Sequence, residues 1–140
     1  MEKSERRWNQ TLEVRAAGET SSDLVLVGYA AKFDVETMRW PGSFEVVRRG
    51  AFTEAIKNDD PIAYWVHEKR EVLGRKSSGT LTLMEDAIGL FVEIRMANTV
   101  INQNYYESVR RGDVRGMSFG FFAHPDGQRW SVRADGSELS

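Results

Sequence analysis

The chain has 140 residues, which fits one domain, and its 41% hydrophobic and 29% charged residues are typical of a folded protein rather than a disordered one. The formal net charge of −2 provides no global field for a polyanion, which argues against nucleic-acid binding. The absence of cysteine excludes disulfides, thiolate metal sites and a cysteine nucleophile, and we expect no metal and no cofactor. Residues 1–10 lack an apolar signal region, and the longest apolar stretch, residues 24–31, is too short to span a membrane. The sequence therefore predicts a soluble intracellular protein with no membrane partner.

The predicted secondary structure is dominated by strands. Residues 1–10 are polar and are predicted to be a flexible N-terminus before a single domain at 11–140. Apolar patterns and turn signals predict strands, in chain order, at residues 11–17, 24–33, 62–67, 80–84, 89–96, 114–123 and 130–133. The strand at 24–33 is apolar on both faces, which predicts a central position in its sheet. Between strands we expect a loop with a short extended piece at 34–50, a charged turn at 68–71 and another turn at 124–127.

Two helices are predicted. Residues 51–57 allow two helical turns that end before Pro61. A longer helix is expected to begin at a cap, Asn98 or Thr99, and to end near Arg111, with Gly112 as its stop. Many strands with few helices, and no βαβ alternation, indicate a mainly β fold with a few helices (α+β), built as an antiparallel β barrel or sandwich.

Ser118 lies in a distinctive part of the last long strand, RGMSFGFF at residues 115–122. Side chains alternate along a strand, so Ser118 lies on one face between Gly116 and Gly120. Glycine weakens a strand interior and often marks a place where a ligand or another backbone comes close. The gap would let an extended peptide reach the hydroxyl, and the two glycines are predicted to line a substrate cleft. The alternative is a buried serine bonded to backbone, with glycines that relieve crowding.

The residues GMSFG also match the G-x-S-x-G pattern of the α/β-hydrolase nucleophile elbow. That elbow needs a strand, a sharp turn and then a helix. Here the GMSFG motif is followed by FFAHPDGQRW, which cannot begin a long helix, and the chain is short for that fold. We therefore reject this match.

A serine hydroxyl needs a base to become a nucleophile, and the chain has two histidines. His124 is six residues from Ser118 on the same strand face, roughly 20 Å away in a straight strand, which is out of reach. His67 ends the strand at 62–67, where it shares a face with Trp65, a bulky neighbour that could aim the imidazole. A solvent-facing histidine at a strand end is the competing interpretation, so the residues alone leave the role of His67 open.

Several segments occur together in a characteristic order: VGYAAKFD, PGSFEVVRRGAF, YWVHEKREVLGRKSSGTL, GLFVEIRMANT, SVRRGDVRGM and SFGF. In this order and spacing they resemble the prohead maturation proteases of tailed phages, of the Hong Kong phage capsid type. The resemblance covers about residues 24–123. No single segment is decisive, and the specificity lies in their combination.

The resemblance implies a serine endopeptidase with an antiparallel β barrel similar to the herpesvirus assemblins, in which a histidine precedes a serine along the chain. By motif, His67 would be the general base and Ser118 the nucleophile of an acyl transfer. The implied substrates are scaffold segments of the major capsid protein and the enzyme itself, cut in the host cytoplasm inside the assembling prohead. An extended substrate would pair with an exposed strand edge. By analogy with the assemblins, a homodimer is a candidate assembly.

The C-terminal end departs from the family pattern. Family members continue with further strands, including a segment similar to L-x-E-V-S and a Pro-Ala pair, whereas this chain ends in DGSELS. We therefore expect the domain at 11–140 to lack its C-terminal segment, with the histidine-orienting residue and part of the oxyanion hole. Asp113, Asp126 and Glu138 are candidates for orienting the histidine, and nothing in the sequence selects one. Two other readings stay open: a non-catalytic capsid-assembly or scaffolding module with the same barrel, and an unrelated small β-barrel binding protein.

Overall fold

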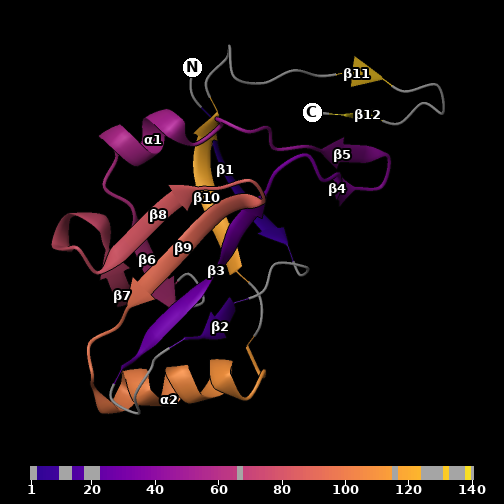
Figure 1. Ribbon diagram of the computed structural model, residues 1–140. Helices are drawn as coiled ribbons and strands as arrows, with labels where there is room; N and C mark the ends of the chain where they lie inside the picture. Colours follow the sequence, from indigo (N-terminus) through magenta and orange to yellow (C-terminus); the bar gives the residue numbers. More distant parts are fainter. Residues whose placement is uncertain are drawn as a thin grey trace.

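The computed structural model describes residues 3–9, 14–17, 23–65, 68–114, 117–123, 131–132 and 138–139 (Figure 1). In this part of the chain the protein is mainly β, with two α-helices and one short 3-10 helix. The strands are β1 (Lys3–Asn9), β2 (Val14–Ala16), β3 (Val25–Lys32), β4 (Thr37–Trp40), β5 (Ser43–Glu45), β6 (Ile62–Trp65), β7 (Glu68–Arg75), β8 (Leu81–Glu85), β9 (Gly89–Arg95), β10 (Met117–Ala123), β11 (Ser131–Val132) and β12 (Glu138–Leu139). The helices are α1 (Thr53–Asn58), η1 (Lys76–Ser78) and α2 (Val100–Arg110).

The described strands form four separate sheets. Two have four strands, in the orders β2-β3-β9-β8 and β11-β12-β5-β4, and two are pairs, β1-β10 and β6-β7. Neighbouring strands are antiparallel except β12 and β5, which run parallel. The mainly β fold with a few helices is confirmed, but none of the described sheets closes into the predicted barrel. Apolar alternation marks strands and their faces, whereas closure depends on which backbone edges meet, which the pattern does not encode.

The sheet β2-β3-β9-β8 is the centre of the molecule. In Figure 1 it runs through the middle, with α2 across one end, α1 near the opposite end of β8, and β1 and β10 behind it. β3 lies between β2 and β9 and is buried along most of its length, so its predicted central position is confirmed. The buried core consists of apolar residues from β3, β7, β8, β9 and the segments around α2: Leu24, Leu26, Ala30, Ala31, Leu73, Leu81, Leu90, Val92, Ile94, Met96 and Val109.

The pairing of β3 with β9 contains one irregularity, which a glycine makes possible. The register shifts between Tyr29 and Ala31, and beyond the shift Lys32 pairs with Gly89. A Cβ atom built on Gly89 would lie 2.0 Å from the carbonyl oxygen of Ala31. The two backbones therefore approach more closely at this point than any residue with a side chain would allow.

Helix α2 begins and ends where the sequence predicts. The Thr99 side chain accepts a hydrogen bond from the amide of Asn102, which caps the first turn. At the other end Gly112 has a left-handed φ of 84°, and its amide donates to the carbonyl of Val109. The helix buries Val109 against the core, and it leads towards β10.

Three predicted segments differ from the structure. The loop predicted at 34–50 contains two strands, β4 and β5, joined at a turn in which Gly42 has a φ of 82°. Residues 68–71, predicted as a charged turn, belong to β7. Residues 3–9, within the predicted flexible N-terminus, form β1 and pair with β10. These segments are polar or short, so their pairing leaves little apolar periodicity in the sequence.

Candidate active site

Ser118 is the second residue of β10, and β1 is the strand that pairs with it. The antiparallel register places the Cα of Ser118 opposite that of Trp8, and the Cα of Gly120 opposite that of Arg6. Gly120 follows Ser118 by two residues in the same strand. Gly116, the other predicted cleft residue, lies outside the described residues.

The predicted base, His67, falls between β6 and β7 in the sequence and also lies outside the described residues. The two strands that flank it form an antiparallel hairpin, whose last described pair is Trp65 with Glu68. The structure therefore defines the strand ends on either side of His67. The approach of His67 to Ser118 stays a prediction.

The β6–β7 hairpin is irregular close to His67. The ladder partner of Tyr64 is Val72, whereas that of the next residue, Trp65, is Glu68. The three residues of β7 at 69–71 therefore lie between the partners of two successive residues in β6. Bulges of this kind bend a strand and increase its twist, and they are over-represented next to active sites.

Trp65 joins the end of this hairpin to helix α2. Its ring is stacked on that of Tyr105, with ring centroids 4.1 Å apart and an angle of 13° between the ring planes. Both residues are half-buried and pack against the core. Because Tyr105 belongs to the helix that precedes β10, the end of β6 contacts the element that leads to Ser118.

The acidic residues considered for orienting the histidine lie in three different places. Asp113 is exposed, and its Oδ2 lies 3.6 Å from Nε of Arg111. Glu138 is in β12, where its backbone pairs with Ser43. Asp126 lies outside the described residues. No contact described here assigns the role of the third residue to Asp113, Asp126 or Glu138.

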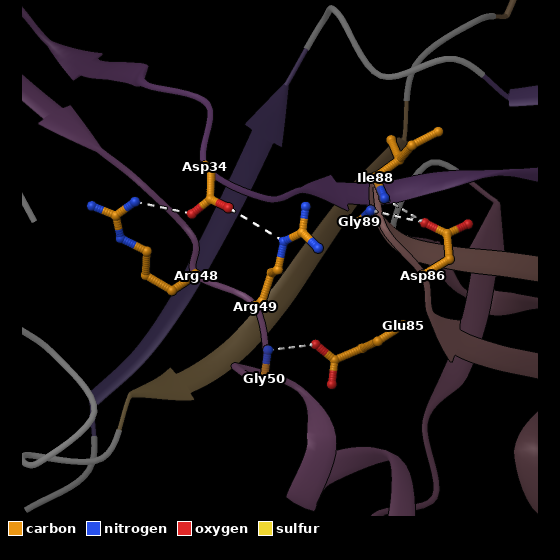
Figure 2. A network of polar contacts seen from close by, with 8 residues as sticks. All are labelled: Asp34, Arg48, Arg49, Gly50, Glu85, Asp86, Ile88 and Gly89. Atoms are coloured by element: carbon orange, nitrogen blue, oxygen red, sulfur yellow. Dashed lines mark hydrogen bonds and ion pairs between the residues drawn. The ribbon is translucent and has the colours of Figure 1, made fainter.

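A polar network that the sequence analysis missed connects residues 34–53 to the β8–β9 hairpin (Figure 2). Asp34 follows β3 with a left-handed φ of 59°, a conformation that Asp tolerates better than most residues. Its Oδ1 accepts a hydrogen bond of 2.9 Å from Nη1 of Arg48, and its Oδ2 lies 3.5 Å from Nε of Arg49. The Arg48 hydrogen bond, with a smaller contribution from Arg49, holds the pKa of Asp34 below its ordinary value. Exposed pairs such as these add little to global stability.

Glu85, at the end of β8, is the second acidic residue of this network. Its Oε2 accepts a hydrogen bond of 3.0 Å from the amide of Gly50, and its Oε1 accepts one of 2.6 Å from the hydroxyl of Thr53. The carboxylate therefore holds the start of α1 against the end of β8. Both partners lie more than thirty residues away in sequence, and no local signal predicts the contact.

Asp86 is the third acidic residue, and it shapes the β8–β9 turn. Its Oδ1 accepts hydrogen bonds from the amides of Ile88, at 2.8 Å, and Gly89, at 3.0 Å. Its Oδ2 accepts a hydrogen bond of 2.6 Å from the phenol of Tyr29. The Tyr29 hydrogen bond is the main cause that lowers the pKa of Asp86, and the same bond raises the pKa of Tyr29. The sequence D-A-I-G carries a local signal for this turn, because Asp side chains commonly accept from amides two and three residues ahead.

The chemistry of this network is structural. Each of the three carboxylates accepts hydrogen bonds from an arginine, a hydroxyl or backbone amides. In the described part of the chain, no group of three or more His, Cys, Asp or Glu residues could hold a metal ion. No helix among the described residues is long and apolar enough to cross a membrane.

The family model that matches this chain is that of the caudovirus prohead serine proteases, and the match spans residues 10–139. Comparison with curated proteins and with solved structures found no match. The family match covers nearly the whole chain, including β6, β7, α2 and β10. It argues against an unrelated binding protein and favours an enzyme over a non-catalytic module. The chain therefore belongs to the caudovirus prohead serine protease family, and it is a serine protease.

Proposed function

We propose that Ser118 is the nucleophile and His67 the general base of this prohead protease. The observation that supports the proposal is the position of Ser118 in β10, two residues before Gly120. The chain has two histidines, and His67 precedes Ser118 in the order expected for this family. It lies two residues after the last residue of β6, Trp65, whose ring is stacked on Tyr105 of α2.

The proposed reaction is acyl transfer from a peptide to Ser118 and then to water. His67 accepts the proton of the Ser118 hydroxyl while Oγ forms a bond to the substrate carbonyl carbon. The protonated His67 then gives this proton to the departing amine as the peptide bond breaks. Water attacks the ester, His67 takes a proton from the water, and that proton returns to Ser118 as the carboxylic acid leaves. Backbone amides would stabilise the oxyanion in both halves of the reaction.

The proposed substrates are extended segments of a capsid protein scaffold and the protease itself, cut inside the prohead. Because Gly120 has no side chain, an extended peptide can lie close to the β10 backbone there and reach Ser118. Main-chain hydrogen bonds to a strand edge would supply affinity, and alternate side chains would supply specificity.

Incubation of the purified chain with capsid precursor, followed by mass spectrometry of the fragments, tests the proposal. Ser118→Ala and His67→Ala are each expected to abolish cleavage and labelling by a fluorophosphonate probe, because neither member of such a pair works without the other. Ser78→Ala, in the exposed helix η1, and His124→Ala are the matched controls and should cleave normally. Cleavage at an undiminished rate by Ser118→Ala would rule out this serine as the nucleophile.

A further inference from the structure

Building on the proposed function, we propose that Tyr105 is a positioning residue for His67, and that it acts through the stack of its ring on Trp65. A general base must be held within a fraction of an ångström of its working position, by neighbours that are themselves fixed. The residues that fix the β6–β7 hairpin next to His67 are therefore part of the catalytic apparatus, although they do not touch the substrate.

The hairpin ladder alone holds this region poorly. The register of β6 on β7 shifts at two successive steps, on either side of Tyr64, before the last pair of Trp65 with Glu68. Each shift interrupts the ladder hydrogen bonds and leaves residues of one strand unpaired. The ladder therefore gives the end of β6 at Trp65 little support, and contacts with another element matter more there.

The Trp65–Tyr105 stack provides that support. The ring centroids are 4.1 Å apart and the planes nearly parallel, at 13°, so the two rings overlap over a large area. Trp65 is the last described residue before His67 and lies two positions from it in the sequence. We therefore expect a change in the position of the indole to alter the position of His67.

Helix α2 is a rigid support for Tyr105 because both of its ends are fixed. At the start, Thr99 caps the first turn, and the buried Asn102 donates from Nδ2 to the carbonyl of Ala97 at 2.9 Å. Near the end, Val109 is buried in the core. The Tyr105 ring projects from the middle of this anchored helix.

The same helix also holds the chain that leads towards the Ser118 strand. The amides of Asp113 and Val114 both donate to the carbonyl of Ser108, at 2.9 and 3.2 Å, and Val114 packs against the core. β10 begins three residues after Val114. One helix therefore contacts the hairpin next to the proposed base and holds Val114, three residues before the strand that carries the proposed nucleophile.

The test compares Tyr105→Leu with Tyr106→Leu, a substitution of the neighbouring tyrosine that also packs against the core. Tyr105→Leu is expected to lower kcat by about 10²-fold, the effect of a misplacement of about 1 Å, with KM unchanged. The rate of fluorophosphonate labelling should fall in parallel. Tyr105→Phe keeps the ring and should restore both values to near wild type, while Tyr106→Leu should change neither at a temperature where the protein is folded.

Trp65→Leu provides a second route to the same result if Tyr105→Leu does not fold. It should reproduce the loss in kcat, and the double variant should lose no more than either single variant, since both remove one contact. Equal losses in Tyr105→Leu and Tyr106→Leu, each proportional to the unfolded fraction, would overturn the inference and leave the proposed function intact. Normal labelling in Ser118→Ala and His67→Ala would instead overturn the proposed function itself.

Discussion

The phenol of Tyr29 and the carboxylate of Asp86, 57 residues apart in the chain, are joined by a hydrogen bond of 2.6 Å. Tyr29 lies at the point where the β3–β9 register shifts, and Asp86 accepts from the amides of the β8–β9 turn. The bond therefore ties the irregular part of β3 to the turn that follows β8. It lowers the pKa of Asp86 and raises that of Tyr29, because each group is stabilised in the form that makes the bond.

Tyr29→Phe should destabilise the protein over a defined pH range. The contribution through Asp86, whose folded pKa is lowered, is complete above about pH 4 and is lost as the pH falls through the folded pKa. The contribution through Tyr29, whose folded pKa is raised, is complete below about pH 10 and is lost as the pH rises through that pKa. Urea unfolding at a series of pH values should therefore show the largest difference between wild type and variant at intermediate pH. If the difference in the free energy of unfolding between wild type and Tyr29→Phe does not vary with pH, the hydroxyl acts through packing and not through its bond to Asp86.

Gly89→Ala should be strongly destabilising, because the new Cβ would lie 2.0 Å from the carbonyl oxygen of Ala31. The atoms that it meets belong to the backbone of Ala31 and Lys32, which cannot move aside as a flexible side chain could. The expected loss in the free energy of unfolding is about 4 kcal/mol, at the upper end for single substitutions. Gly79→Ala is the matched control. Gly79 has no atom within 4 Å of the added Cβ and a φ of 74°, so only the backbone penalty of about 1–2 kcal/mol applies. Equal midpoints of chemical unfolding for the two variants would contradict the close approach of β9 to β3.

Gly120→Val should weaken substrate binding more than it lowers the stability of the fold. In the proposed cleft the added methyl groups would obstruct an extended peptide that lies on the face of β10 shared with Ser118. The expected result is a large rise in KM for capsid precursor, with little change in the rate of labelling by a small fluorophosphonate, which does not need the cleft. Loss of labelling together with a lower unfolding midpoint would show instead that the glycine serves packing within the β1–β10 pair.

The sequence predicts those parts of the fold in which apolar residues recur at a regular spacing. β3 is apolar on both faces and lies inside its sheet, and the strands predicted at 80–84 and 89–96 are present as β8 and β9. Helix α2 has a local cap and a local stop, Thr99 and Gly112, and its bounds follow from them. β1, with the residues KSERRWN, has no regular apolar spacing. Its backbone pairs with β10, which lies far away in sequence, so nothing local predicts the strand.

In the candidate site, too, features with a local sequence signal could be predicted and long-range contacts could not. Ser118 stands out because two glycines flank it in an apolar strand, and the turn at Asp86 has a local signal in D-A-I-G. The contacts of Glu85 with Gly50 and Thr53, and the stack of Trp65 on Tyr105, join residues tens of positions apart. Neither contact depends on periodicity, so only the folded structure shows it.

The pairing of β1 with β10 has a consequence for synthesis of the enzyme. Every residue pair in this ladder joins positions between 108 (117 − 9) and 120 (123 − 3) residues apart. Contacts over such separations form slowly, because a long loop must close before any of them is gained. On the ribosome, which adds residues from the N-terminus onward, β1 is made first and waits for its partner until residue 123 has emerged. The strand that carries Ser118 is therefore among the last described elements to be completed, after the sheet of β2, β3, β9 and β8 has all of its residues.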